Sequence, residues 1–337
     1  MTRKINNSYL LGQSNAPTTG GDMLKTRSDG TLVWEEVDGT TYMPPVWYGD
    51  RGIFSLDYND TLIEYITISS AGNATDFGDL TVSRGYGGAC SNGSRGVFLG
   101  GFKDDVVDYD TIDYITISTT GNALDFGDLT AVRQQGGACS NGTRGVSGGG
   151  MTRDITQKDT IEYIVIATTG NATDFGDLTL ARTFTASCAD STRGIWAGGG
   201  RSDAQRNTID YITIDTTGDA TDFGDLTLAR YGAAGCSSTT RGVFGGGGWT
   251  GALDGTVIDY ITIQTTGNAT DFGDLTIEGE QLGGCSDATT AVFAGGYHPS
   301  TSRLATMDYI TIASTGNASD FGDLSAARYP LAGTSGD

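Results

Sequence analysis

Paired carboxylates are the chemical groups that recur most often in this sequence. The tetrapeptide Asp-Phe-Gly-Asp occurs six times, with its first residue at Asp76, Asp125, Asp174, Asp222, Asp271 and Asp320. Carboxylates bind calcium where about six to eight oxygens converge, and they cleave glycosides where two of them flank the bond. These pairs supply few oxygens each, and 41 acidic residues single out no catalytic pair. Repetition in every unit favours a structural role, and calcium binding at these turns is left open.

Arginines recur in the same units and are the partners we expect for the acids. One set contains Arg51, Arg95, Arg144, Arg193 and Arg241, and the other contains Arg84, Arg133, Arg182, Arg230 and Arg328. The unit that carries Cys285 has Thr290 and Gly279 at these two places. We therefore predict arginine–aspartate bridges within or between units.

The cysteines also follow the repeat. Cys90, Cys139, Cys188, Cys236 and Cys285 occupy one equivalent position per unit, and the sixth unit has Thr334 there. Their number is odd, and their spacing does not match the paired cysteines of a zinc site. We predict that they are reduced, buried and used as small packing side chains.

No arrangement typical of an enzyme accompanies these groups. The single histidine, His298, has no recurring partner, and no serine lies in a Gly-x-Ser-x-Gly motif. Asp-Phe-Gly occurs in protein kinases, but the glycine-rich loop with its lysine is absent here. The arginine cluster and sequence boxes of six-bladed sialidases are also missing. We predict a protein without catalytic activity, cofactor or metal.

The elements that carry these groups form a regular repeat. A tyrosine marks each unit, and successive tyrosines lie 48 or 49 residues apart: Tyr65, Tyr114, Tyr163, Tyr211, Tyr260 and Tyr309. One unit of this length cannot close its own core, so neighbouring units must cover one another. In the unit around Tyr114, four β-rich segments are expected at residues 136–141, 95–101, 111–118 and 123–130.

The units resemble the kelch repeat of β-propellers. They share a glycine doublet that ends one strand (Gly100-Gly101, Gly149-Gly150, Gly199-Gly200, Gly295-Gly296), a tyrosine in the next strand and an aromatic residue further on. A phenylalanine replaces the usual tryptophan, and the first unit has Leu56-Asp57 in place of the doublet. The resemblance covers residues 46–337 and implies an all-β, six-bladed propeller of four-stranded antiparallel blades. The first unit lacks an innermost strand, so we expect the C-terminal residues 329–337 to supply it and close the ring.

The strand order predicts two different faces. The turns that repeat almost unchanged fall on one face, here named the constant face. The loops after the glycine doublet and the connections after the acidic motif differ in every unit, and they fall on the other, the variable face. Divergence on one face of a constant frame indicates a recognition surface. The candidate partner-binding residues on this face are Tyr58, Tyr86, Phe102, Tyr109, Arg153, Phe184, Arg201, Arg206, Tyr231, Trp249, Tyr297, His298, Arg303 and Tyr329.

The composition excludes several classes of partner. The formal charge of −21 disfavours nucleic acid and anionic membrane surfaces. No apolar run is long enough to span a membrane, and the N-terminal apolar stretch is too short for a signal peptide. We expect synthesis in the cytoplasm of the producing cell.

Residues 1–45 are interpreted as an attachment and linker segment that leaves from the constant face. The stretch from Gly21 to Val37 resembles short joining segments of bacteriophage tail-fibre and appendage proteins. That resemblance implies a virion protein anchored to other virion proteins through residues 1–45, with the variable face toward a glycan or outer-membrane protein of the bacterial host. Appendages of this kind are often trimeric, and the copy number is left open. The alternatives are a capsid or tail decoration protein without a receptor, a polysaccharide hydrolase and a cellular kelch-like scaffold.

Overall fold

The computed structural model describes residues 49–57, 60–103, 107–200, 204–248 and 255–336, together with the backbone of three strands nearer the start of the chain. The chain divides into two compact units, Met1–Pro45 and Val46–Asp337. In the first unit, β1 (Arg3–Lys4), β2 (Asp22–Thr26) and β3 (Leu32–Glu36) form an antiparallel sheet in the order β1-β3-β2. The described residues contain no helix.

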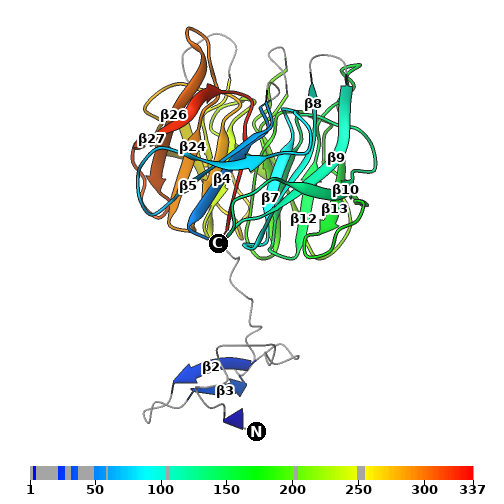
Figure 1. Ribbon diagram of the computed structural model, residues 1–337, viewed down its shortest axis with the longest axis vertical. Helices are drawn as coiled ribbons and strands as arrows, with labels where there is room; N and C mark the ends of the chain where they lie inside the picture. The colour runs from blue at the N-terminus through cyan, green and yellow to red at the C-terminus, as the bar shows by residue number, and fades with distance from the viewer. Residues whose placement is uncertain are drawn as a thin grey trace. The chain divides into compact units, whose positions relative to one another are not determined.

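The second unit is the predicted six-bladed β-propeller, a ring of antiparallel sheets (Figure 1). Blade 1 contains β28 (Ala332–Gly336), β4 (Arg51–Ser55), β5 (Leu62–Thr67) and β6 (Thr75–Asp79). Blade 2 contains β7 (Gly88–Ser91), β8 (Arg95–Lys103), β9 (Val107–Thr116) and β10 (Leu124–Asp128). Blade 3 contains β11 (Gly137–Ser140), β12 (Arg144–Gly148), β13 (Thr160–Val165) and β14 (Thr173–Asp177). Blade 4 contains β15 (Ala186–Ala189), β16 (Arg193–Ala197), β17 (Thr208–Thr213) and β18 (Thr221–Asp225). Blade 5 contains β19 (Ala234–Ser237), β20 (Arg241–Gly245), β21 (Val257–Thr262) and β22 (Thr270–Asp274). Blade 6 contains β23 (Gly283–Ser286), β24 (Thr290–Ala294), β26 (Ser302–Thr311) and β27 (Ser319–Arg328), with the short β25 (Tyr297–His298) beside β26.

Each blade has the same aromatic core contact. The repeat tyrosine of the third strand meets the phenylalanine of the outer strand edge-on, with ring centroids 5.9–6.1 Å apart. The phenylalanine is buried in every blade. This contact explains why the phenylalanine lies further along the unit than the tryptophan of the kelch repeat. The structure also corrects one register: the glycine doublet of blade 4 is Gly198-Gly199, because these two have the left-handed φ angles of the other doublets.

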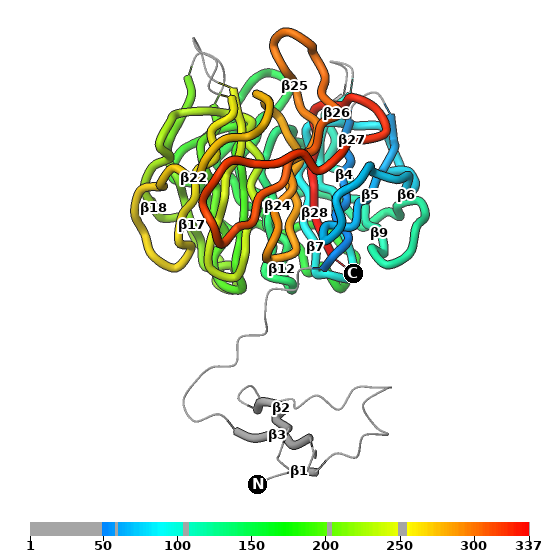
Figure 2. The backbone as a smooth tube through the Cα atoms, turned by 90° about the vertical axis from the view of Figure 1, so that its left-hand side faces the viewer, coloured from blue at the N-terminus to red at the C-terminus, as the bar shows by residue number. Residues whose placement is uncertain are grey.

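The C-terminal strand closes the ring, as predicted. In Figure 2, β28 lies beside β4, and the register pairs Ala332 with Ser55 and Gly336 with Arg51. The start of β4 and the end of β28 therefore lie together at the constant face. Sharing one blade between the two ends of the propeller sequence leaves no unpaired inner strand edge at the closure.

The repeated acidic motif forms a latch between neighbouring blades. A Gly-Asn-Ala turn of one blade lies against the Phe-Gly-Asp strand of the preceding blade. At the junction of blades 1 and 2, for example, the Ala123 N–H donates to the Asp79 carbonyl, and the Asp79 N–H donates to Asn122 Oδ1. All six junctions have both bonds, with Asp219 replacing the asparagine once. The constancy of the motif therefore comes from backbone contact between blades.

One set of arginines forms the predicted bridges, but with different acids. Arg84 pairs with Asp113 at 2.7 Å, Arg182 with Asp210 at 2.8 Å and Arg230 with Asp259 at 3.0 Å. Arg133 pairs with Glu162, and Arg328 with Glu64. These acids belong to the third strand of the following blade, not to the Asp-Phe-Gly-Asp motif. Each arginine is buried and ties the connection after one blade to the sheet of the next.

The other set of arginines does not form the predicted ion pairs. Arg51, Arg95, Arg144, Arg193 and Arg241 lie over the tyrosine of their own blade, at 4.2–4.7 Å from the ring centroid. Each also donates to an isoleucine carbonyl of the next blade, as Arg95 does to Ile166 at 2.9 Å. Stacking on a ring satisfies the cation without a carboxylate.

Small residues surround the axis, and the cysteines are among them, as predicted. All five cysteines are free and buried. A Cβ atom on Gly145 would lie 2.6 Å from Cys90 Sγ, and Gly52, Gly194 and Gly242 likewise leave room for a thiol of the preceding blade, whereas blade 6 has Ala291 at this position. Serine hydroxyls link neighbouring inner strands: Ser140 donates to the Ser91 carbonyl, and Ser91 donates to the Ser335 carbonyl. The last of these bonds crosses the ring closure.

Candidate functional site

The variable face is built from two families of segments that lie next to each other. One family comprises the connections after the outer strands, and the other comprises the loops after the second strands. Isolated backbone bridges join them: Gly85 pairs with Phe102, Gln134 with Met151, Tyr231 with Gly248, and Glu280 with Tyr297. The two families of divergent segments therefore form one surface, as the strand order predicted.

Four of the predicted aromatic residues form a continuous row on this face. Ring centroids are 5.1 Å apart for Phe102 and Tyr86, 5.7 Å for Tyr86 and Phe184, and 5.7 Å for Phe184 and Tyr231. All four side chains are partly exposed. The row spans blades 2 to 5, so residues more than a hundred positions apart in the sequence share one aromatic surface. We name it the aromatic row.

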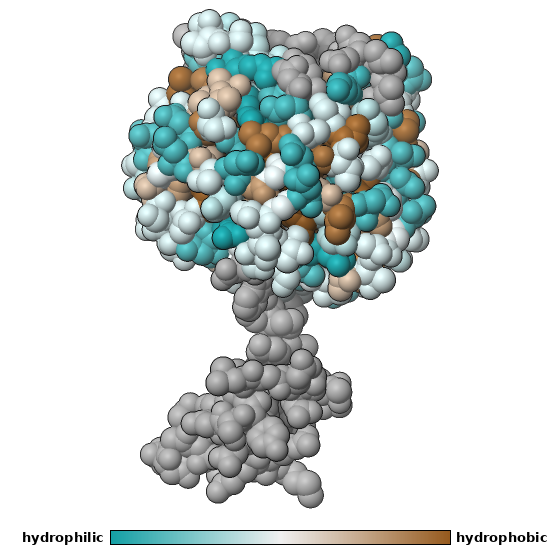
Figure 3. All heavy atoms as spheres, in the orientation of Figure 1, coloured by the Kyte–Doolittle hydropathy of each residue, from teal (hydrophilic) through white to brown (hydrophobic). Residues whose placement is uncertain are grey.

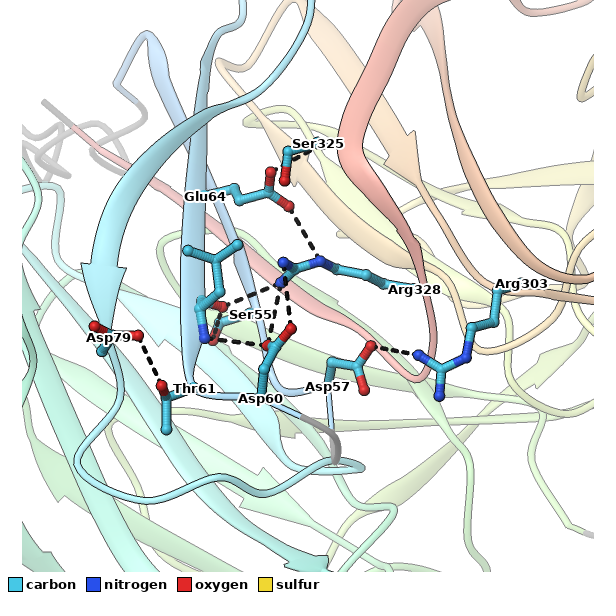
Figure 4. Close-up of polar contacts among 10 residues, drawn as sticks. Ser55, Asp57, Asp60, Thr61, Glu64, Asp79, Arg303, Ser325 and Arg328 are labelled. Carbon is cyan, nitrogen blue, oxygen red and sulfur yellow. Dashed lines mark hydrogen bonds and ion pairs between the residues drawn. The ribbon is translucent and has the colours of Figure 1, made fainter.

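Three more predicted residues form a second cluster beside the ring closure. Tyr297 and Tyr329 have ring centroids 5.1 Å apart, and the Arg303 guanidinium lies 5.1 Å from the Tyr329 centroid. Figure 4 shows Arg303 directed toward Asp57 of blade 1, at 2.8 Å. The same view shows Arg328 between Asp60 and Glu64. These ion pairs join blade 6 to blade 1 and hold the second cluster in place.

The mouth of the ring at this face has a strained backbone. Four non-glycine residues at equivalent positions have left-handed φ angles: Tyr86 at 61°, Gln135 at 63°, Phe184 at 57° and Gln281 at 60°. The fifth equivalent residue is Gly232 at 69°, and the sixth is Pro330. We name these six the mouth ring. Left-handed backbone at a residue with a side chain costs about 1–3 kcal/mol, and such residues gather at functional sites.

Backbone hydrogen bonds run around the mouth ring. The Gln135 N–H donates to the Tyr86 carbonyl, Phe184 to Gln135, Gly232 to Phe184 and Gln281 to Gly232, at 2.5–2.9 Å, and Leu331 donates to Gln281 at 3.2 Å. The left-handed angles turn each N–H toward the preceding blade. The strain is therefore coupled to a belt of hydrogen bonds that fixes the side chains of the mouth ring.

Below the mouth ring is a hollow of about 80 Å³ on the axis. We name it the axial hollow. Its lining contains no charged residue. The residues that line it are Tyr86, Gly87, Gln135, Gly136, Phe184, Thr185, Gly232, Ala233, Gln281, Leu282, Pro330 and Leu331. Two buried polar atoms of the lining have no hydrogen-bond partner, Thr185 Oγ1 and Gln281 Oε1. Six further atoms of this kind among the described residues belong to the buried arginine–acid pairs of the frame, so these two are the ones that belong to a hollow rather than to an ion pair.

A partly buried carboxylate, Glu280, directly precedes Gln281 of this lining in the chain. Glu280 hydrogen bonds to the Tyr231 hydroxyl, and burial raises the pKa of the Glu280 carboxyl above its usual value. Burial and the neighbouring carboxylate likewise raise the pKa of Tyr231. The tyrosine thus remains protonated and donates to the glutamate. A Cβ on Gly248 would lie 2.8 Å from the Tyr231 ring, so the facing loop leaves room for this pair.

The remaining predicted residues do not line the axial hollow. Tyr109 belongs to β9, Arg153 is exposed, and Arg206 is partly buried. His298 accepts the Ser300 and Thr301 N–H groups at Nδ1 and contacts Glu278 through Nε2 at 3.0 Å, which gives it a role in a turn. Tyr58, Arg201 and Trp249 lie outside the described residues.

Sequence reasoning missed four residues of this site: Gln135, Thr185, Gln281 and Glu280. None is aromatic or cationic, which were the types sought on the variable face. The signal was available in the repeat itself, because Thr185 replaces a glycine of blades 2 and 3. The backbone angles that direct Gln135 and Gln281 at the mouth carry no residue-type signal, since left-handed φ normally favours glycine.

Away from this face the propeller offers little that points to a ligand. Figure 3 shows hydrophobic residues scattered among hydrophilic ones on one side of the ring. Within the described part of the chain, no group of three or more histidine, cysteine or acidic side chains is placed to hold a metal ion. In that same part, no helix has the length and apolar character needed to cross a bilayer.

Comparison with protein-family models and with curated protein sequences finds no match to this chain. The fold and the geometry of the variable face define the class of protein, a six-bladed β-propeller consistent with the kelch-like architecture. Among the residues that the structure describes, the axial hollow is a concave site whose lining contains partnerless polar atoms.

Proposed function

We propose that this protein is a recognition module that binds a surface partner through its variable face. One observation carries the proposal: the described parts of the divergent loops and connections, the aromatic row and the axial hollow lie at one end of a frame that is otherwise repeated almost unchanged. Partly exposed aromatic rings supply contact area with little loss of side-chain entropy on binding, and they dominate binding energy at interfaces. The constant face carries both ends of the propeller sequence.

Within that function, we propose a bacteriophage tail-fibre or appendage protein that contacts the host surface. Support comes from the sequence of residues 21–37, which resembles joining segments of such proteins, and from the acidic composition. Residues 1–45 would attach to other virion proteins. An attachment at the constant face would leave the variable face directed at the host.

Binding of the labelled full-length protein to intact cells from a panel of bacterial strains tests this function. We expect binding to a subset of strains, and a loss of about tenfold or more for the double variant Tyr86→Ala/Tyr297→Ala, which removes one ring from each aromatic cluster. Thr120→Ala, an exposed residue of a constant-face turn, is the matched control and should bind as the wild type does. Equal binding by all three proteins would contradict the assignment to the variable face.

Immunogold labelling of virus particles with an antibody to the full-length protein tests the location. Labelling at the tail, together with strain-selective cell binding, supports an appendage. Labelling of the particle by a protein that binds no strain would overturn the recognition function in favour of a decoration protein.

A further inference from the structure

We propose that the axial hollow binds one ring of an uncharged saccharide. The inference depends on the recognition function proposed above and names a ligand class for the same face. It is carried by four properties of the described residues: the aromatic wall of the hollow, its partnerless polar atoms, the absence of charge from its lining, and the strained backbone that directs side chains into it.

Two rings of the aromatic row form the wall. Tyr86 and Phe184 belong to the lining, and Tyr231 continues the row from Phe184. Tyr86 and Phe184 come from blades 2 and 4, yet their rings touch above Gln135 of the blade between them, which is 9% exposed. Aromatic faces carry partial negative charge and attract the C–H groups on the apolar face of a pyranose ring.

Two polar atoms belong to residues of the same lining. Thr185 is 8% exposed, and its hydroxyl has no hydrogen-bond partner. Gln281 Oε1 is also without a partner. Water in the hollow can pair with such atoms, so a ligand that displaces the water without replacing its hydrogen bonds loses about 1–3 kcal/mol for each atom. A sugar offers several hydroxyl groups that donate and accept at once, so its polar edge satisfies both atoms while its apolar face contacts the wall.

The absence of charge from the lining determines which saccharides the hollow can bind. The lining has no cation to neutralise a carboxylate or a sulfate, and burying an unpaired charge is strongly unfavourable. Glu280 directly precedes Gln281 in the chain and adds a carboxylate next to a residue of the lining. Sialic acids and uronic acids are therefore excluded, as are phosphate groups. Neutral hexoses and N-acetylhexosamines fit the chemistry of the site.

The strained backbone of the mouth ring indicates that its side chains have a role in binding that outweighs the cost of the strain. Gly232 shows that glycine is compatible with this place in the mouth ring, and glycine would remove the strain. Four of the six places nevertheless hold an aromatic residue or a glutamine. The hollow is several times larger than the roughly 10–15 Å³ that a single buried water requires, so it admits the edge of a small ring.

A printed array tests this proposal with the labelled full-length protein. The array carries neutral oligosaccharides that end in glucose, galactose or N-acetylhexosamine, beside sialylated and uronate-containing ones. We expect binding to a subset of the neutral group and none to the acidic group. Thr185→Val, which removes the free hydroxyl and keeps the shape, should weaken binding to the best neutral ligand about tenfold. Thr334→Val makes the same change in the inner strand β28, at a residue outside the lining of the axial hollow, and should leave binding unchanged.

Two outcomes would overturn the proposal and leave the recognition function intact. In the first, the protein binds cells, but Thr185→Val and Gln281→Gly bind the neutral ligand as tightly as wild type does, which places the saccharide elsewhere. In the second, the array shows no neutral ligand and protease treatment of the cells abolishes binding, which identifies a protein partner. Failure of the wild-type protein to bind any cell would instead overturn the recognition function itself.

Discussion

Gly279 stands where the other five blade junctions have a buried arginine, and Asp308 is the carboxylate that such an arginine would contact. Asp308 follows Gly279 by the same 29 residues that separate Arg84 and Asp113. Asp308 is buried and accepts the Thr276 N–H at 2.7 Å and the Thr276 hydroxyl at 2.6 Å. A Cβ on Gly279 would lie 3.1 Å from Leu282 and 3.2 Å from Leu304, so leucines fill the space of the missing arginine. The junction between blades 5 and 6 thus holds a buried acid beside apolar side chains.

We expect Asp308→Asn to raise the free energy of unfolding at pH 7 by about 1–2 kcal/mol, because it removes a buried charge that has no counter-ion. The amide oxygen still accepts the Thr276 N–H, and the amide nitrogen can donate to the Thr276 hydroxyl. Urea denaturation followed by tryptophan fluorescence measures the change. Asp113→Asn is the matched control: it removes the partner of Arg84 and should destabilise the protein instead.

The benefit of Asp308→Asn should depend on pH. Burial raises the pKa of the Asp308 carboxyl above its usual value of 3.8. The folded state therefore takes up this proton at a higher pH than the unfolded state does. The charge penalty is complete above the folded-state pKa, shrinks as the pH falls through it, and is gone near 3.8. The stability difference between variant and wild type should shrink over this window, and a constant difference would contradict the assignment.

A buried pair that is complete should respond in the opposite direction. Arg182 contacts Asp210 and donates to the carbonyls of Gly198 and Thr208. We expect Arg182→Leu to lower the free energy of unfolding by about 3–5 kcal/mol, because it leaves Asp210 buried without a partner. Replacing both members by leucine should recover most of this loss. Thr120→Ala, at an exposed turn residue, should change stability by less than about 0.5 kcal/mol.

These pairs show how far the sequence predicted the frame. The period gave the number of blades, and the missing first strand gave the closure, because both depend on spacing alone. The partner of Arg84 was wrongly expected in the acidic motif. An acid directly before the repeat tyrosine, such as Asp113, recurs in all six units, but two recurring sets of acids give no way to choose between them without the packing of the blades. The motif itself recurs for a reason that lies in the next blade, where the Gly-Asn-Ala turn approaches its glycine.

The variable face could be predicted as a surface but not as a site. Strand order places Tyr86 and Phe184 at one end of the ring, but only the left-handed backbone brings their rings into contact across Gln135. Thr185 is informative only when it is aligned with the glycines of other blades. Loops that do not repeat contain no internal reference, so the arrangement of Arg303, Tyr329 and Asp57 had no signal in the sequence.

The latch at the ring closure allows a matched test with two glycines. A Cβ on Gly322 would lie 2.6 Å from the Gly72 carbonyl oxygen, and Gly322 has a φ of 141°. A Cβ on Gly72 would meet nothing closer than 4.0 Å. We expect Gly322→Ala to destabilise by about 2–4 kcal/mol, from overpacking and backbone strain together. The free energy of unfolding of Gly72→Ala should stay within about 0.5 kcal/mol of the wild-type value. Thermal denaturation of both variants and the wild type measures these differences.

The five cysteines should be inert in the folded protein. Burial raises the pKa of Cys90 to about 12, and it raises the pKa values of the other four thiols as well. Thiolate is the reactive form, so at pH 8 almost none is present. A colorimetric thiol reagent should detect no thiol in the native protein and all five after denaturation in guanidinium. Rapid reaction of even one thiol in the native state would contradict the tight packing between blades.

Gln281 and Gln135 make the final prediction, because they share a strained backbone but differ in their partners. Gln135 donates from its amide to Gln134 and accepts the Thr183 hydroxyl at 2.7 Å, whereas Gln281 Oε1 is unpaired. We expect Gln281→Gly to raise the free energy of unfolding by about 1 kcal/mol, since it relieves left-handed strain and removes an unpaired buried atom. Gln135→Gly relieves the same strain but breaks two hydrogen bonds, so it should not stabilise the protein. If Gln281→Gly gains stability while saccharide binding falls, the strain at the mouth ring is maintained for ligand binding; a loss of stability would show that Gln281 belongs to the frame.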